Sequence, residues 1–227
     1  MAELIEMHSF PIEEVRRQFP ALQRQYKERT AAYFDGPGGS QVVQSAIQAI
    51  TSYMINGGAN LHGAFPTSRE TEDLIAAARQ AAADLTAAKP SEVAFGANMT
   101  TLTLALSRAI AATWREGDEI VVTELDHRAN VDPWLRAAED RGVTVRWLKV
   151  DRETLTLDLR DIEAVITPRT RLVAVGLASN AVGTINDMHP IATRARDMGA
   201  LVAVDAVHAA PHMALDRDAL GADILLC

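Results

Sequence analysis

Polar side chains that could bind a charged ligand follow four apolar stretches of this sequence. The stretches are SEVAFG, EIVVTEL, RLVAVGLA and ALVAV, and the residues after them are Asn98-Met99-Thr100-Thr101, Asp126-His127, Ser179-Asn180, and Asp205 with His208. If these stretches are neighbouring parallel strands, their carboxyl ends meet at one edge of the sheet, where open α/β sheets bind ligands. We therefore expect these residues to contribute to a single site.

The first of these groups, Asn98 to Thr101, suits a phosphate. It joins a predicted strand to a predicted helix, so free backbone N–H groups lie at the positive end of the helix dipole. The same residues could simply cap the helix, with Asn98 as the N-cap, and both interpretations stay open. The sequence has no G-x-G-x-x-G and no Walker lysine motif, which disfavours dinucleotide and P-loop sites.

The other polar residues suit an organic ring. A carboxylate at Asp205 could keep a pyridine nitrogen protonated, although it could also be an N-cap. His127 could lie on an aromatic ring or move a proton, or it could cap a surface turn. Asn180 could donate to a cofactor oxygen or serve a turn. Asp205, His208 and His212 have a possible metal-ligand spacing, but we predict no metal because one organic cofactor explains these positions together.

The elements that position these residues alternate along the chain as helix and strand. Apolar strands are predicted at EIVVTEL, VTVRWLKV, RLVAVGLAS, ALVAVDA and GADILLC, with further short strands in SEVAFG and AAYFDGPGGSQ. Nearly continuous apolar strands are typical of a parallel sheet that helices cover on both faces. The predicted fold class is therefore α/β, with three layers and a mainly parallel sheet.

The first third of the chain is predicted to be helical. PIEEVRRQFPAL is a short amphipathic helix, and QVVQSAIQAITSYMI is a longer one that Gly57 ends. Thr67 and Glu70 have the spacing of a capping box, which opens an alanine-rich helix. His62 lies in the polar loop between the last two helices.

Composition and charge exclude several classes of function. The net charge is −8 and the isoelectric point is near 5.2, without a basic stripe, which argues against nucleic acid and an anionic membrane as partners. No apolar run approaches the ~20 residues of a membrane span, and the first ten residues do not read as a signal peptide. One cysteine, Cys227, precludes an internal disulfide and fits a cytoplasmic protein.

Six segments, taken in order, carry a family resemblance. YFDGPGGSQ, NLHGAF, FGANMTTLTLALSRA, GDEIVVTELDHRANVDPW, RTRLVAVGLASNAVGTI and GALVAVDAVHAAPH resemble the class V aminotransferase group of pyridoxal-phosphate (PLP) enzymes, and most closely the cysteine desulfurase-like proteins. The resemblance runs from about Tyr33 to Cys227. It implies the large domain of a fold-type I PLP enzyme at residues 33–227, incomplete and without the small C-terminal domain, after an N-terminal helical segment at 1–32. It also implies a homodimer.

The resemblance assigns roles to individual residues. Met99 and Thr100 align with the pair that holds the cofactor phosphate, and His127 aligns with the histidine that stacks on the pyridine ring. Asn180 aligns with the asparagine near the phenolic oxygen. Asp205 aligns with the aspartate that pairs with the pyridinium nitrogen. His127 and Asp205 are thus the predicted catalytic residues.

Three positions depart from the family pattern or fit it loosely. His208 aligns with a glutamine of the better-known desulfurases, but a histidine can still donate a hydrogen bond to the cofactor. Met99 stands where the family has threonine, which removes a hydroxyl and keeps a backbone N–H. His62 lies in a loop that could reach the substrate or the partner subunit.

The lysine that forms the internal Schiff base in this family follows the strand that GADILLC begins. The sequence ends at Cys227, and none of its three lysines, Lys27, Lys89 and Lys149, fits that place. The segment with the persulfide-forming cysteine of desulfurases also lies outside it. Cys227 itself is expected to be a small buried side chain within a strand.

We therefore expect a PLP-dependent enzyme that acts on an amino acid, most like a cysteine desulfurase that cleaves the C–S bond of cysteine. The 227 residues alone are expected to be inactive. A sulfur-acceptor protein is a further expected partner if the enzyme is a desulfurase. Three alternatives stay open: a class V aminotransferase or epimerase, a non-catalytic half-protein that binds a phosphate ligand, and a nicotinamide-dependent oxidoreductase, which the absent glycine fingerprint disfavours.

Overall fold

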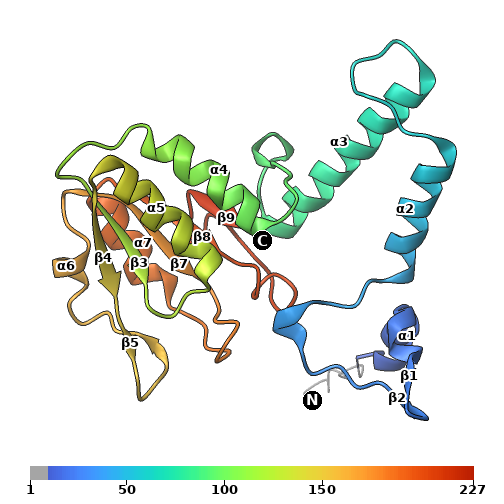
Figure 1. Ribbon diagram of the computed structural model, residues 1–227, viewed down its shortest axis with the longest axis horizontal. Helices are drawn as coiled ribbons and strands as arrows, with labels where there is room; N and C mark the ends of the chain where they lie inside the picture. The colour runs from blue at the N-terminus through green and yellow to red at the C-terminus, as the bar shows by residue number, and fades with distance from the viewer. Residues whose placement is uncertain (1–9) are drawn as a thin grey trace, which may run out of the picture. The chain divides into compact units, whose positions relative to one another are not determined.

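The computed structural model describes residues 10–227, so the first nine residues, on which the signal-peptide prediction rests, lie outside it (Figure 1). The chain divides into two compact units, one that ends at Ile75 and one at Ala76–Cys227. Helix α3 (Pro66–Thr86) runs through the boundary between the units. Among the described residues, no helix is long and apolar enough to cross a membrane.

The first unit consists of short elements and two longer helices. Its elements are α1 (Ile12–Arg17), the 3-10 turn η1 (Pro20–Gln23), the hairpin of β1 (Gln25–Tyr26) and β2 (Arg29–Thr30), η2 (Gly36–Gly38), α2 (Gln44–Asn56) and the start of α3. The helix predicted from Gln41 is confirmed, and Gly57 ends it with a φ of 82°. The short strand predicted at the start of AAYFDGPGGSQ is wrong, because residues 31–35 form no strand, whereas the Gly/Pro turn expected after it is present as η2.

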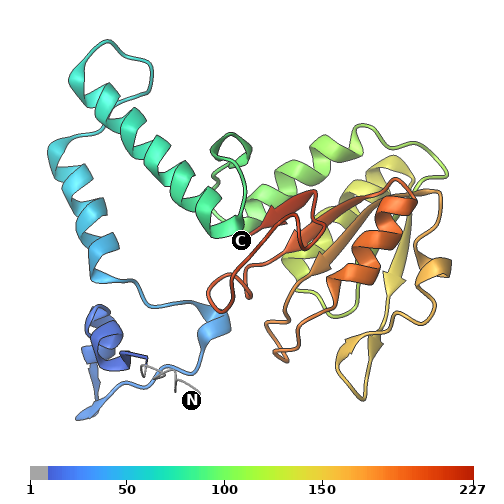
Figure 2. The same cartoon turned by 180° about the vertical axis from the view of Figure 1, so that it is seen from behind.

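The second unit contains a five-stranded parallel sheet in the order β4-β3-β7-β8-β9. All five strands that the apolar segments predicted are present: β3 (Glu119–Thr123), β4 (Thr144–Leu148), β7 (Thr170–Gly176), β8 (Leu201–Asp205) and β9 (Ile224–Leu226). A small antiparallel hairpin, β5 (Val150–Asp151) with β6 (Thr156–Leu157), follows β4. Figure 2 shows β8 and β9 from behind.

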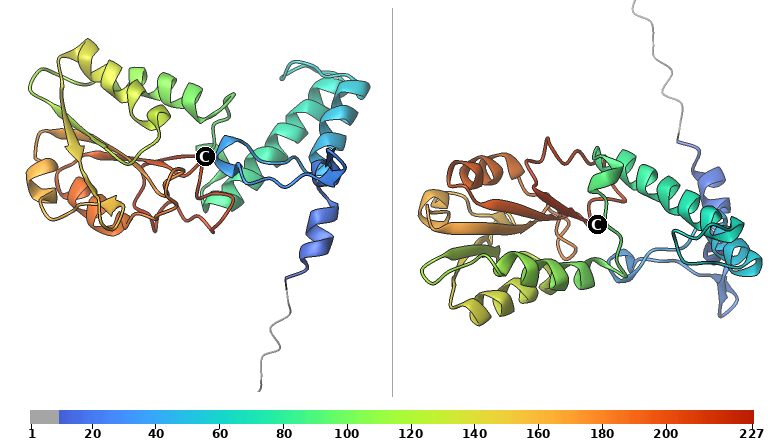
Figure 3. Two further views of the ribbon diagram at one scale, coloured as in Figure 1. Left: turned by 60° about the horizontal axis from the view of Figure 1, so that its bottom comes forward. Right: turned by 90° about the horizontal axis from the view of Figure 1, so that it is seen from above.

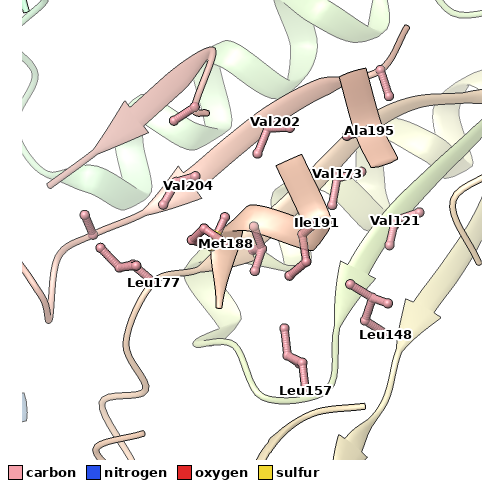
Figure 4. Close-up of a cluster of buried hydrophobic side chains, with 14 of the residues drawn as sticks. Val121, Leu148, Leu157, Val173, Leu177, Met188, Ile191, Ala195, Val202 and Val204 are labelled. Atoms are coloured by element: carbon pink, nitrogen blue, oxygen red, sulfur yellow. The ribbon is translucent and has the colours of Figure 1, made fainter. Parts of the chain in front are cut away.

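Helices cover both faces of this sheet, so the predicted three-layer fold is confirmed. On one face lie α4 (Met99–Ala111) and α5 (Asp132–Arg141), and on the other lie α6 (Ile162–Val165) and α7 (Met188–Asp197), as the end-on view in Figure 3 shows. Alternate strand residues serve the two faces. Ile120 packs with Trp134 of α5, whereas Val121 packs in the cluster of Ile191 of α7 (Figure 4).

The predicted strand SEVAFG is the exception to this agreement. Its start forms the 3-10 turn η3 (Pro90–Glu92), and residues 93–96 pair with no strand of the described chain. The side chain of Arg79 on α3 donates to the backbone oxygen of Val93 and lies 5.9 Å from the ring centre of Phe95. This segment therefore uses its backbone and its aromatic ring against α3 instead of a sheet ladder.

The strand order places a topological switch point at the carboxyl edge of the sheet. From β3 the chain passes through α5 outward to β4, and from β7 it passes through α7 on the opposite face to β8. The connections after β3 and β7 thus leave in opposite directions. Ligands of open α/β sheets bind at such a switch point, which here lies between the ends of β3 and β7.

Candidate active site

The amino end of α4 provides backbone N–H groups at this edge. Because α4 leads into the start of β3, its first turn lies at the carboxyl end of the sheet, where it contacts the turn η4 (Arg128–Asn130). Asn98 is the N-cap, and its Oδ1 accepts from both the backbone N and the Oγ1 of Thr101 at 2.9 Å. The predicted capping role of Asn98 is confirmed, and it leaves the exposed Thr100 hydroxyl for a ligand.

Met99 contributes to this turn through its backbone alone. Its side chain is buried, and its sulfur lies 3.4 Å from the Oγ1 of Thr103 one helical turn later. The side chain therefore packs inward, and the backbone N–H at the first position of α4 is the group that Met99 offers to an anion.

His127 lies between β3 and η4. Its Nδ1 accepts a hydrogen bond from the backbone N of Ala129 at 3.1 Å, so the side chain caps η4. This capping role is one of the two alternatives that the sequence predicted for His127. A neutral imidazole that accepts at Nδ1 carries its proton at Nε2. The residue is exposed, so a ligand at the edge of the sheet can meet the ring and this N–H.

Asp205 is the last residue of β8 and is half-buried. Its Oδ1 accepts from the backbone N of Val207 at 3.0 Å. Burial raises the pKa of Asp205, while the hydrogen bond from the Val207 N–H partly offsets that rise. A carboxylate that burial penalises is stabilised by a cation beside it. This chemistry fits the protonated nitrogen of a pyridine ring.

Asn180 and His208 lie in the segments that follow β7 and β8. Asn180 is half-buried in the tight turn that the Ser179 N to Thr184 O hydrogen bond closes. His208 is half-buried, and its ring centre lies 5.3 Å from that of His212 in an edge-on arrangement. Both residues thus lie at the carboxyl edge, on the segments where the sequence analysis placed them.

His62 belongs to the first unit and is described on its own. It has a left-handed backbone with a φ of 69°, and its Nδ1 lies 3.4 Å from an oxygen of Glu72. The backbone N–H of neighbouring Gly63 donates to Ser68 Oγ, which itself donates to the Asn60 oxygen. The side chain of His62 is 88% exposed, so this loop presents the imidazole outward.

Asp126 is a residue that the sequence placed at the edge of the sheet without a specific role of its own. Its carboxylate accepts from the backbone N of Gly176 at 2.9 Å and from Nδ2 of Asn130 at 2.8 Å. Burial raises the pKa of Asp126 to about 6, and the charge of Asp205 adds to the rise. Its place between a strand end and His127 was visible in the sequence, but its partners, 50 and 4 residues away, were not.

The three lysines and the cysteine are all exposed to solvent. Lys27, Lys89 and Lys149 are all exposed, and the ammonium of Lys149 lies 4.0 Å from Glu124. The prediction that Cys227 is buried within a strand is wrong: β9 ends at Leu226, and Cys227 is exposed. Partial burial of its thiol and the charge of Asp205 raise the pKa of Cys227, which disfavours the thiolate.

Comparison with known proteins identifies the protein family of this chain. Residues 32–227 match the Aminotransferase class-V family, and the chain belongs to that family. Enzymes of this family depend on pyridoxal phosphate.

The similar proteins within that family include cysteine desulfurases and an aminotransferase-like protein. The chain is 38% identical to an aminotransferase-like protein, FGM3, of Gibberella zeae over 95% of its length. It is 34% identical to a probable cysteine desulfurase of Streptomyces coelicolor over 94%. The apo structure of a cysteine desulfurase from Thermococcus onnurineus NA1 covers 99% of the chain with a TM-score of 0.86 and 30% identity, and the chain spans 53% of that structure. The chain spans about half the length of the curated relatives it matches.

Proposed function

We propose that this chain is the cofactor-binding part of a PLP-dependent enzyme that acts on an amino acid, with cysteine desulfuration as the reaction. The observation that carries the proposal is the group at the carboxyl edge of the sheet. It combines the open first turn of α4, the exposed ring of His127 and the half-buried carboxylate of Asp205. Each suits one part of PLP: the phosphate, the ring face and the pyridine nitrogen.

The residues divide the work of binding. The backbone N–H of Met99 and the hydroxyl of Thr100 hold the phosphate dianion, which the helix dipole stabilises. Asp205 keeps the pyridine nitrogen protonated, and His127 covers one ring face and can donate from Nε2. Asn180 would donate to the phenolic oxygen, and His208 would donate a further hydrogen bond to the cofactor. When bound, PLP supplies an electron sink for the electrons released at the α-carbon of an amino acid.

The 227 residues are proposed to bind PLP without reacting with it. All three lysines are exposed, and none stands among the site residues of the second unit. The lysine that bonds the cofactor would then come from outside these residues.

Titration of the purified chain with PLP, followed by borohydride reduction and mass spectrometry, tests this proposal. Saturable binding without a stoichiometric adduct is expected. A stoichiometric adduct at one lysine contradicts the proposed inactivity. A chain that binds inorganic phosphate as tightly as PLP, with no change in the absorption of PLP, supports a phosphate-binding half-protein instead.

An aminotransferase is the second candidate, and the 38% identity to an aminotransferase-like protein favours it. The two reactions differ in their products. Desulfuration of cysteine yields alanine and transfers the sulfur to an acceptor thiol, whereas transamination yields a keto acid and aminated cofactor. The chain extended by the rest of its gene, supplied with cysteine, is expected to form alanine in step with sulfide when a reducing thiol is present. Keto acid formation without alanine would favour the aminotransferase.

A homodimer is part of the same proposal. Helix α2 exposes apolar side chains along one side, among them Ile47, Ile50 and Met54 with exposed fractions of 40%, 61% and 75%. Their spacing of three and four residues forms one helix face, which a second copy of the chain would cover. His62 is proposed to reach the partner's site or the substrate. Sedimentation of the extended protein at several concentrations tests for the dimer, and a monomer throughout contradicts it.

A sulfur-acceptor protein is a proposed partner of the desulfurase reaction, and the cytoplasm is the proposed location. The single cysteine of the chain supports a reducing compartment. Fractionation of cells that produce the native protein tests the location, and recovery outside the cytoplasm would contradict it.

A further inference from the structure

We infer that Asp126 is the positioning residue for His127: it bonds the turn between β3 and η4 to the end of β7 and so fixes the imidazole at the edge of the sheet. This inference rests on the proposed function, because it concerns how the same site holds its ring-stacking histidine. Neither the family pattern nor the sequence assigned a role to this carboxylate.

Two hydrogen bonds close the turn on either side of His127. Asp126 precedes His127 directly, and its carboxylate accepts from Nδ2 of Asn130 at 2.8 Å. The backbone N of Asn130 donates to the backbone oxygen of His127 at 2.9 Å. The turn that carries the histidine is thus closed from both sides by hydrogen bonds. Asn130 is fully buried, so the turn is fastened to the interior of the protein.

A hydrogen bond between Asp126 and Gly176 crosses the switch point. The other carboxylate oxygen of Asp126 accepts from the backbone N of Gly176, the last residue of β7, at 2.9 Å. On its far side Gly176 offers its oxygen to Nδ2 of Asn186 at 2.8 Å. β3 and β7 are neighbours in the sheet, but their connections diverge at this point. The Asp126 side chain therefore ties the His127 turn to a rigid strand instead of leaving it on a free loop.

Gly176 leaves the space that this bond requires. A Cβ on Gly176 would lie 2.8 Å from Oδ1 of Asp126, which is closer than real Cβ atoms approach an oxygen. The carboxylate has little freedom to retreat, because Asn130 holds its other oxygen. Gly176→Ala therefore displaces the Asp126 side chain without altering its chemistry, and it offers a second way to test the same bond.

The bond needs the shape of the Asp126 side chain more than its charge. Asp205 on β8 is the charged group that acts on Asp126, and it disfavours the carboxylate. Asn130 Oδ1 is buried and has no hydrogen-bond partner among residues 10–227. In Asp126→Asn the new side-chain oxygen can still accept from Gly176, and its amide can donate to Asn130 Oδ1 once the Asn130 amide rotates by half a turn. The asparagine variant is thus expected to rescue what an alanine variant loses.

The experiment measures PLP binding by the 227-residue chain and the circular dichroism that the bound ring acquires. We expect Asp126→Ala and Gly176→Ala each to weaken binding by about tenfold, with a changed ring signal, because a misplaced group loses most of its effect. Asp126→Asn is expected to stay within about twofold of the wild type. Glu124→Ala, an exposed carboxylate two residues earlier, is the matched control and is expected to change neither readout.

A double-mutant cycle with His127→Ala tests whether Asp126 acts through the histidine. In the His127→Ala background, Asp126→Ala should cause no further loss of affinity. An equal loss in both backgrounds overturns the inference, as does an Asp126→Asn variant that binds as weakly as Asp126→Ala. If the wild type binds no PLP, the proposed function fails, and the His127 ring resonance of the ligand-free chain becomes the readout. A resonance that Asp126→Ala leaves in place then overturns the inference on its own.

Discussion

The pKa values of the buried carboxylates are shifted in opposite directions at the two edges of the parallel sheet. At the amino edge, Glu119 is 3% exposed and is paired with Arg146 at 2.7 Å and with Arg169 at 2.6 Å. Hydrogen bonds and charges from these arginines hold the pKa of Glu119 down at about 2. At the carboxyl edge, burial raises the pKa of Asp126 to about 6 and also raises that of Asp205.

We expect this difference to separate a structural edge of the sheet from a functional one. A carboxylate with a lowered pKa stabilises the fold at neutral pH, whereas one with a raised pKa destabilises it. Among the described residues, no arginine or lysine forms an ion pair with Asp126 or Asp205. Groups kept at a cost to stability cluster at functional sites, and the predictions below test this contrast.

The largest expected effect is at the amino edge. Glu119→Ala leaves Arg146 and Arg169 without their carboxylate and should lower the free energy of unfolding by about 3 kcal/mol. Chemical denaturation at pH 7 measures this loss, and PLP affinity should not change. Glu124→Ala, which removes an exposed partner of Lys149, is the control and should cost less than about 1 kcal/mol. Similar losses from both variants would remove the distinction between the buried carboxylate of Glu119 and the exposed one of Glu124.

The second effect is at the carboxyl edge, where a substitution should lower the affinity for PLP and leave the stability unharmed. Asp205→Asn should weaken PLP binding by about tenfold to a hundredfold, because a charge-assisted hydrogen bond to the ring nitrogen becomes a neutral one. Its free energy of unfolding at pH 7 should stay equal or rise, since a buried charge is removed. Titration and denaturation of the same samples check both expectations. A variant that loses stability while it keeps its affinity would make Asp205 a structural residue.

The third effect is the pH dependence of stability, which should have opposite signs for the carboxylates at the two edges of the sheet. The pKa of Asp126 is raised to about 6 in the folded protein. Its contribution to the free energy of unfolding is therefore fully present below the pKa that it has in the unfolded chain, and that contribution is lost as the pH rises through 6. Asp126→Asn should therefore be more stable than the wild type at pH 8 by about 1 to 2 kcal/mol, and the difference should vanish near pH 4. Glu119 acts in the reverse sense, since its contribution is present above pH 4.5 and falls away toward pH 2. Denaturation of the Asp126 and Glu119 variants at several pH values compares the two carboxylates. If the effects of both variants on the free energy of unfolding changed with pH in the same direction, the opposite pKa shifts would be contradicted.

The smallest effect is at the phosphate end of the site. Thr100→Ala removes one exposed hydroxyl from the first turn of α4 and should weaken PLP binding by about fivefold, close to 1 kcal/mol. The neighbouring Thr101→Ala is the informative partner, because the Thr101 hydroxyl already donates to Asn98. It should therefore affect the helix more than the ligand. A larger loss of PLP affinity at Thr101 than at Thr100 would reverse their proposed roles.

The sequence predicted the sheet well because apolar strand segments are long, regular and bounded by polar turns. It predicted that Asp205 and His127 share an edge, because the ends of parallel strands converge there. It failed at SEVAFG, where side-chain contacts of Arg79 replace strand pairing. It could not assign Asp126 a role, since the bond to Gly176 joins residues that only the folded strand order brings together. The domain division at residues 32 and 33 stays a prediction.

The burial of Trp134 has a practical consequence for optical work. Trp134 is fully buried on α5, one helical turn beyond Asn130, and its indole N–H has no hydrogen-bond partner in the described structure. An indole in such apolar surroundings emits at shorter wavelength than an exposed one such as Trp147, which is 37% exposed. With Trp114 and Trp147 replaced by phenylalanine, Trp134 would become a built-in fluorophore that reports when the turn that carries His127 loosens.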